Sequence, residues 1–349
     1  MVAQRSARVP KGERAPSMHD VATLAGVSHQ TVSRVLNGFA GVRPETKADV
    51  LAAIEDLGYR RNNAARALVL GRSQAIGVLV PNTPNFGPTS SLYAVETAIR
   101  KAGFQPLITV TPEDAPSVEG ALDFLFDHAV EALVLMAAVR NVLDVADAHD
   151  VKVPVAYLLT GDERGQWSVS VSQEGAVALA IGHLVDQGHT KIQHISGPLM
   201  STEALLRAEA VAVEFERRGL ESLPILQGDW TAESGYELAS HVDPTATAIF
   251  CGNDQIAMGV IHALADHGLR VPEDMSVIGI DDIPESAFFL PALTTVSQDF
   301  SAVGELAVEL LVAALAGHEL PDTTPLPAKL ITRASVSAPR SSGPLERRS

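Results

Sequence analysis

Five polar side chains lie close together near the amino end of the chain, in a pattern that could recognise DNA. Their lengths and hydrogen-bonding groups suit contacts with base edges and phosphates, and they are His29, Gln30, Ser33, Arg34 and Asn37. Between them, Val32, Val35 and Leu36 recur at the spacing of one apolar helical face. The segment therefore predicts a helix that packs by one face and presents a polar recognition face on the other.

A preceding helix is expected to position this recognition helix. Val21, Leu24 and Ala25 form its apolar face. Gly26 breaks that helix, and Ser28 is a good N-cap for the next one. Two short helices joined by a glycine-containing turn make a helix-turn-helix unit.

A third helix is expected downstream. It would begin near Pro44 and end at Gly58, and its buried face would consist of Val50, Leu51, Ile54 and Leu57. Three helices with one polar face predict a small DNA-binding domain. A three-helix packing module that binds no DNA would show the same periodicity, so the pattern alone leaves that alternative open.

The charge of the chain is distributed unevenly. The 349 residues have a formal net charge of −16, yet residues 1–72 hold 11 basic and 6 acidic side chains, and the remainder holds 15 and 36. A cationic segment on an acidic body suits phosphate binding by that segment alone. Chance clustering on a solvated surface would give the same asymmetry, so charge supports the DNA-binding interpretation without deciding it.

Cysteine usage and hydropathy indicate the cellular compartment in which the protein is expected. Cys251 is the only cysteine, which excludes an internal disulfide framework and fits a reducing environment. The first residues are polar and basic without the apolar region of a secretory signal, and no apolar run reaches the length of a membrane span. We therefore expect a cytoplasmic protein with no membrane partner.

From residue 73 onward, short apolar runs alternate with amphipathic segments. Strands are predicted over Ala75–Val80, Pro106–Val110, Ala132–Leu135, Val153–Leu158, Lys191–Ile195, Ala248–Phe250 and Ser276–Ile280. Helices between them are predicted over Ser91–Ala102, Val118–His128, Gly175–Gln187, Glu203–Arg218, Ala232–Val242 and Gln255–His267. This alternation predicts parallel sheets in an α/β fold, and about 260 residues suit two such sheets better than one. Ligands of such folds bind at the carboxyl ends of the strands.

The amino-terminal motifs also resemble a known family. DVATLAGVSHQTVSRVLNG followed by RPETKADVLAAIEDLGYRRNNAARAL is similar to the DNA-binding headpiece of LacI/GalR-family regulators. The resemblance implies that His29 and Gln30 read bases in the major groove. It also implies backbone or neighbouring base contacts by Ser28, Ser33, Arg34 and Asn37. Arg61 departs from the pattern, because the family usually has proline there.

A hinge helix is implied over residues 62–72. In the resembling family such a segment folds on DNA and inserts a leucine into the minor groove, a role that would fall to Leu68, with Asn62 and Ala65 also at the DNA. A helix this short is marginal in isolation. An ordinary helical linker, with Leu68 covering the following domain, is the alternative.

The resemblance extends to about Thr332 through IGVLVP, GHLVDQGHTKIQHISGP, CGNDQIAMGVIHAL and VIGIDDIPESAFFLPALTTVSQD. It implies a two-lobed, periplasmic-binding-protein-like core over residues 73–336 with an all-α headpiece over 17–61, and tails at 1–16 and 337–349. Lobe one would comprise 73–171 and 298–327, and lobe two 172–297 and 328–336.

The resemblance places an effector site between these lobes. The residues that match it are Phe86, Pro88, Glu203, Arg207, Trp230, Asn253, Asp281, Gln298 and Phe300. Taken singly, Trp230 suits a core position, Asp281 a helix cap and Arg207 a surface partner of Glu203. The sequence also departs from lactose-repressor-like members at Leu159 and Glu203, where those members have aspartate and serine. A saccharide is implied, but no particular galactoside.

The partners follow from the same resemblance. We expect a homodimer on palindromic operator DNA, controlled by a small-molecule effector that is a mono- or disaccharide, with no cofactor and no metal. A transport solute-binding protein has a similar core but would need a signal peptide and no headpiece. An enzyme is the third class, but the chain has no HExxH, GxSxG or phosphate-loop motif and its histidines lack zinc spacing.

Overall fold

The computed structural model describes residues 16–36, 38–39, 41–60, 72–161 and 164–340. The chain divides into two compact units, Met1–Ser73 and Gln74–Ser349. The predicted hinge segment and both tails lie largely outside the described residues, as do Asn37, Asn62, Ala65 and Leu68.

The first unit contains three helices, α1 (Met18–Leu24), α2 (His29–Leu36) and α3 (Pro44–Leu57). Ser17 and Asp20 form a capping box at the start of α1, and the Ser28 hydroxyl accepts a hydrogen bond from Thr31 N at 3.1 Å before α2. Gly58 ends α3 with a φ of 59°, a conformation that favours glycine. The predicted helices and turns are therefore present.

Two predicted core positions of this unit are wrong. Leu24 is 53% exposed and Leu51 is 49% exposed, whereas Ala22 and Ala53 are buried. The buried cluster consists of Val21, Ala22, Val32, Val35, Val50, Ala53 and Tyr59. Small alanines let these short helices approach closely, so the contact rotates toward them and the neighbouring leucines fall outside it.

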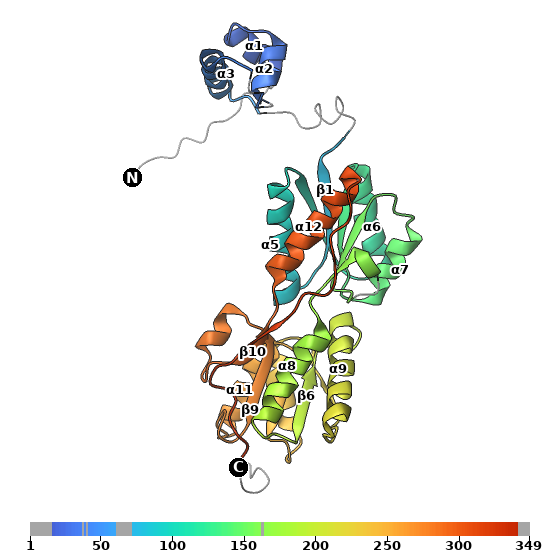
Figure 1. The fold of residues 1–349 in the computed structure, drawn as a ribbon, viewed down its shortest axis with the longest axis vertical. Helices are drawn as coiled ribbons and strands as arrows, with labels where there is room; N and C mark the ends of the chain where they lie inside the picture. Colours follow the sequence, from blue (N-terminus) through green and yellow to red (C-terminus); the bar gives the residue numbers. More distant parts are fainter. Residues whose placement is uncertain (1–15, 37, 40, 61–71, 162–163, 341–349) are drawn as a thin grey trace, which may run out of the picture. The chain divides into compact units, whose positions relative to one another are not determined.

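The second unit contains two sheets, one parallel and one mainly parallel (Figure 1). The first, in lobe one, has the order β2-β1-β3-β4-β5, with bounds β1 (Ala75–Pro81), β2 (Gln105–Thr111), β3 (Ala132–Met136), β4 (Val155–Leu158) and β5 (Ser168–Val169). All its pairings are parallel. The helices of this lobe are α5 (Phe86–Lys101), α6 (Ala115–Asp127), α7 (Arg140–Ala148) and α12 (Phe300–Ala316).

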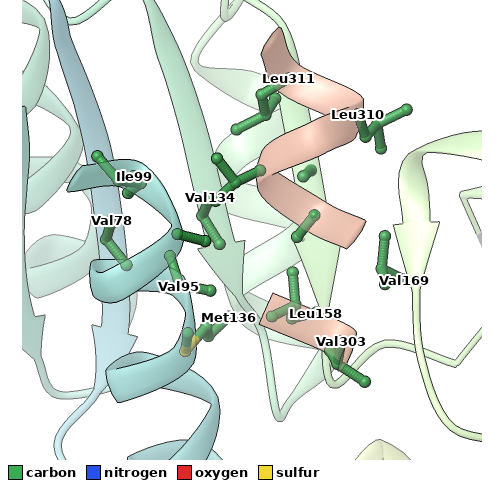
Figure 2. Packing of buried hydrophobic residues seen from close by; sticks show 14 of the residues in the cluster. Val78, Val95, Ile99, Val134, Met136, Leu158, Val169, Val303, Leu310 and Leu311 are labelled. Carbon is green, nitrogen blue, oxygen red and sulfur yellow. The ribbon is translucent and has the colours of Figure 1, made fainter. Parts of the chain in front are cut away.

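Lobe one has an apolar core on each side of its sheet. Figure 2 shows α5 and α12 packing over β1, β3 and β4, with Val78, Val95, Met136 and Leu158 among the buried side chains. On the other face, leucines and valines of α6 and α7 form a second cluster. The strands are therefore covered on both sides, which explains their continuous apolar runs.

The second sheet, in lobe two, has the order β11-β10-β9-β8-β6-β7. Its strands are β6 (Ile192–Ser196), β7 (Leu226–Gln227), β8 (Ala248–Cys251), β9 (Ser276–Asp281), β10 (Thr294–Ser297) and β11 (Lys329–Ile331). Only the β10–β11 pairing is antiparallel among those described. The helices are α8 (Gln173–Asp186), α9 (Thr202–Arg218), α10 (Ala232–Leu238) and α11 (Asp254–Asp266).

All seven predicted strands are present, with ends shifted by at most two residues. Helix α5 begins at Phe86 rather than at the predicted Ser91. Pro88 lies in its first turn, where N–H groups have no partner within the helix, so proline is tolerated there. Helices α7 and α12 were not among those predicted. The sequence of α12 is apolar on nearly every side, so no amphipathic period marks it.

Candidate functional site

The polar face of α2 is available to a partner of the first unit. Ser28, His29, Gln30 and Arg34 are exposed and Ser33 is half-buried, while Val32 and Val35 on the opposite face are buried. The guanidinium of Arg34 lies 5.6 Å from the centre of the Phe39 ring. The described part of the predicted recognition surface is therefore presented together on one helix.

A cavity of about 300 Å³ lies in the second unit, between its two lobes. Its walls are formed by residues that follow the carboxyl ends of β1, β2 and β3 in lobe one and of β6, β7, β8 and β9 in lobe two. The carboxyl ends of parallel strands are where ligands bind in α/β folds.

Seven of the nine predicted effector residues line this cavity. They are Phe86, Pro88, Glu203, Arg207, Trp230, Asn253 and Asp281. Gln298 and Phe300 do not line it and instead contact residues that do. The Gln298 amide donates to Asp281 Oδ1 at 2.7 Å, and the Phe300 ring meets the Phe86 ring edge-on at 5.9 Å.

Arg207 is held rigidly at the floor of the cavity. Its Nε donates to Gln173 Oε1 at 2.7 Å and its Nη1 to the Gly252 carbonyl at 2.5 Å. The Glu203 carboxylate lies 3.9 Å from Nη2. The side chain is 3% exposed, so Arg207 is a buried fork and not a surface partner of Glu203.

Gln173 was not predicted as a site residue. It is buried at the start of α8, and its Nε2 donates to Gln298 Oε1 at 3.0 Å while its Oε1 accepts from Arg207. It therefore joins three segments that are distant in sequence. No local pattern marks such a residue, because its role depends entirely on tertiary contacts.

Trp230 is seated on two glycines. A Cβ at Gly197 would lie 2.2 Å from Trp230 Cε2, and one at Gly252 would lie 3.2 Å from Cζ3. Trp230 itself has a φ of 74°, and its carbonyl accepts a hydrogen bond from Asn253 Nδ2 at 3.1 Å. The Arg207 guanidinium lies 5.4 Å from the indole centre. One flat aromatic surface therefore lines the cavity, fixed from several directions.

Several acidic groups in and near the cavity have raised pKa values. Burial above all, together with the Glu203 carboxylate, raises the pKa of Asp281 to about 7, although Arg207 and the Gln298 hydrogen bond favour the charged form. Burial also raises the pKa of Glu203, against the effect of Arg207. Asp254, behind Asp281, accepts from Thr295 Oγ1 and Ile283 N, and burial holds its pKa well above the usual range.

The fold and the cavity define the class of protein: a helix-turn-helix unit joined to a two-lobed ligand-binding core. Residues 17–62 match the bacterial regulatory proteins of the lacI family, and residues 181–336 match the periplasmic binding protein-like domain. The lactose operon repressor of Escherichia coli (strain K12) is 31% identical over 330 residues, which are 93% of this chain and 91% of that protein. The chain belongs to the LacI family.

Other relatives agree in fold and length. The HTH-type transcriptional repressor PurR of Histophilus somni (strain 129Pt) is 34% identical over 334 residues, covering 92% of this chain and 98% of that protein. The lac repressor dimer bound to operator and the anti-inducer ONPF has a TM-score of 0.84 at 30% identity, covering 93% of this chain and 100% of that one. The CelR–cellobiose complex has a TM-score of 0.67 at 27% identity, covering 92% and 99%.

The chain is therefore a DNA-binding transcriptional regulator of the LacI family, and its core is the effector-binding part. The predicted fold class and the predicted regulatory function are confirmed. Among the described residues, no group of histidine, cysteine and acidic side chains could hold a metal ion. None of the helices in that part of the chain combines the length and the hydropathy that a membrane crossing needs.

Proposed function

We propose that this regulator binds palindromic operator DNA as a homodimer in the cytoplasm and has no enzymatic activity. One headpiece, residues 17–61, would occupy each half-site, with a hinge over 62–72 and the core over 73–336. His29 and Gln30 would read bases in the major groove, and the DNA backbone or neighbouring bases would be contacted by Ser28, Ser33, Arg34 and Asn37. The observation that supports this is the exposed polar face of α2 opposite its buried valines.

The effector would be a saccharide bound in the cavity between the lobes. An indole is a platform for the apolar face of a pyranose, and Arg207, Asn253 and Asp281 supply groups for hydroxyls. Two similar proteins were solved with the sugar ligands ONPG and cellobiose. The lobes would be residues 73–171 with 298–327, and residues 172–297 with 328–336.

Operator binding tests the DNA half of this proposal. Fluorescence anisotropy with palindromic and scrambled duplexes should show a preference for one palindrome. His29→Ala should weaken specific binding by about tenfold or more, since a good base contact contributes about 1–3 kcal/mol, and should leave nonspecific binding within twofold. His19→Ala, an exposed histidine on α1, is the matched control. Equal affinity for palindromic and scrambled DNA would refute sequence-specific binding.

A sugar panel tests the effector half. At least one mono- or disaccharide should change operator affinity, and Trp230→Ala should abolish that change while operator affinity without sugar stays nearly intact. If Trp230→Ala removes operator binding as well, the indole is better explained as part of the core. Turnover of the bound sugar would contradict the proposal that the chain is not an enzyme.

A further inference from the structure

Acidic side chains outnumber basic ones in the described walls of the cavity. Four carboxylates line it, Glu113, Glu203, Asp229 and Asp281, whereas Arg207 is the single basic side chain among its described lining residues. The carboxylates come from both lobes: Glu113 follows β2, and the others belong to lobe two. In a partly enclosed site, charges interact more strongly than in bulk water. A cationic group on a ligand is therefore favoured over an anionic one.

Arg207, the one cation of the described lining, is already in contact with several protein groups. Arg207 already donates to Gln173 and to the Gly252 carbonyl, and it lies near Glu203 and over the Trp230 ring. A phosphate or carboxylate on the ligand would have to approach Nη2 beside the Glu203 carboxylate, which lies 3.9 Å from that atom. It would also approach the other carboxylates of the wall, which repel it.

Glu113 is the lining carboxylate that has a buried oxygen without a hydrogen-bond donor among the described residues. Its Oε1 is buried and has no hydrogen-bond partner in the described part of the chain. Its own backbone carbonyl accepts from Asn141 Nδ2 at 2.6 Å, which fixes the position of the residue. Burial raises the pKa of Glu113, and a cation beside the carboxylate would favour its charged form. A buried acceptor without a donor is costly, so a rotation of the carboxylate that brings Oε1 to a donor on the ligand would be favourable here.

The arrangement of the two walls suits one kind of ligand. Trp230, Asn253 and Arg207 in lobe two can hold the ring and hydroxyls of a sugar, while Glu113 in lobe one faces the same cavity. A neutral hydroxyl would satisfy Glu113 only weakly. A protonated amine would give a charge-assisted hydrogen bond, which is roughly twice as strong as a neutral one, and would connect the lobes.

We infer that the effector is an amino sugar whose ammonium group pairs with the Glu113 carboxylate. This inference rests on the proposed saccharide site and specifies its ligand class. Neutral sugars of the same shape bind more weakly, and sugars with a phosphate or carboxylate are excluded. The amine also ties effector binding to lobe one, because Glu113 is its partner there.

The test is calorimetric titration of the full chain, near neutral pH and at low salt, with matched ligands. Glucosamine, glucose, N-acetylglucosamine and glucuronate form one set, the corresponding galactose derivatives a second, and cellobiose with the glucosamine disaccharide a third. At least one amine should bind about tenfold tighter than its neutral parent, a factor that corresponds to about 1.4 kcal/mol. Acetylation, which removes the charge, should abolish that preference, and the uronates should not bind.

Glu113→Gln separates the charge from the shape. It should lower affinity for the amine to that of the neutral sugar, so that the two ligands bind equally. Glu119→Gln, an exposed carboxylate on α6, should change neither affinity. If a neutral sugar binds as tightly as its amine, or if Glu113→Gln keeps the preference, the inference is overturned and the saccharide proposal stands. If no sugar binds at all, the saccharide proposal fails and the inference fails with it.

Discussion

Gly197 is the position where one added methyl group should report on the cavity. A Cβ there would lie 2.2 to 2.4 Å from three atoms of the Trp230 indole. Carbon atoms in contact are about 3.5–4.0 Å apart, so Gly197→Ala forces the ring to move by roughly 1.3 Å. Gly252 lies beside Gly197 and also packs against the indole, since a Cβ there would lie 3.2 Å from Trp230 Cζ3.

The size of the effect follows from the contacts of Trp230. The displaced ring changes its contact with Arg207, whose guanidinium lies 5.4 Å from its centre, and no longer offers the same surface to a sugar. A cation–π contact contributes about 0.5–2 kcal/mol and overpacking costs about 1–3 kcal/mol. We expect effector affinity to fall about tenfold or more and the folded core to lose about 2 kcal/mol of stability. Operator affinity without effector should stay within twofold.

Calorimetry with the most tightly bound sugar of the panel, together with indole fluorescence and thermal unfolding, measures these changes. Gly120→Ala is the control, because a Cβ at that position of α6 meets nothing within 4 Å. It should leave sugar binding unchanged and stabilise the helix by up to about 1 kcal/mol. Unchanged sugar affinity and unchanged indole emission in Gly197→Ala would show that Trp230 does not form the ligand platform.

Substitutions at three further positions test the fold and its electrostatics. The pKa of Asp281 is raised to about 7 from 3.8, so between these pH values the folded state retains a proton that the unfolded state has lost. The free energy of unfolding should therefore fall by roughly 2 kcal/mol between about pH 5 and 7. Asp281→Asn should remove this pH dependence. Gly259→Ala should cost about 3 kcal/mol in denaturant unfolding, because its Cβ would lie 1.8 Å from the Ala232 carbonyl oxygen; an unchanged midpoint would contradict this. Gly58→Ala should cost about 1 kcal/mol in thermal unfolding of the headpiece, since φ is 59° there, and Gly58→Asn should recover part of it.

The sequence predicts those features that local chemistry determines. The turn at Gly26, the cap at Ser28 and the end of α3 at Gly58 each depend on a few neighbouring residues, and the structure has all three. The cavity was also predictable in outline. Parallel strands bring their carboxyl ends to one edge, so Asn253 and Asp281, which lie at the ends of neighbouring strands, are brought to the same cavity.

Features that depend on packing were not predictable. Periodicity identifies a helical face but not its edges, so Leu24 and Leu51 were placed in the core although alanines occupy it. Gln173 and Glu113 were not predicted as site residues, for a different reason. One is a buried amide between segments and the other an acidic residue in a loop, and either type is ordinary in sequence until the fold gives it a position.

A series of side-chain hydrogen bonds next to the cavity can couple ligand binding to the arrangement of the two lobes. Arg207 bonds to Gln173, Gln173 to Gln298, and Gln298 to Asp281. Gln173 and Gln298 lie where the chain passes between the two lobes, whereas Arg207 and Asp281 face the cavity. A ligand that draws either charged group toward itself therefore changes bonds at two crossovers at once. Because a ligand shifts an equilibrium only by its difference in affinity for the two states, these bonds are where such a difference can arise.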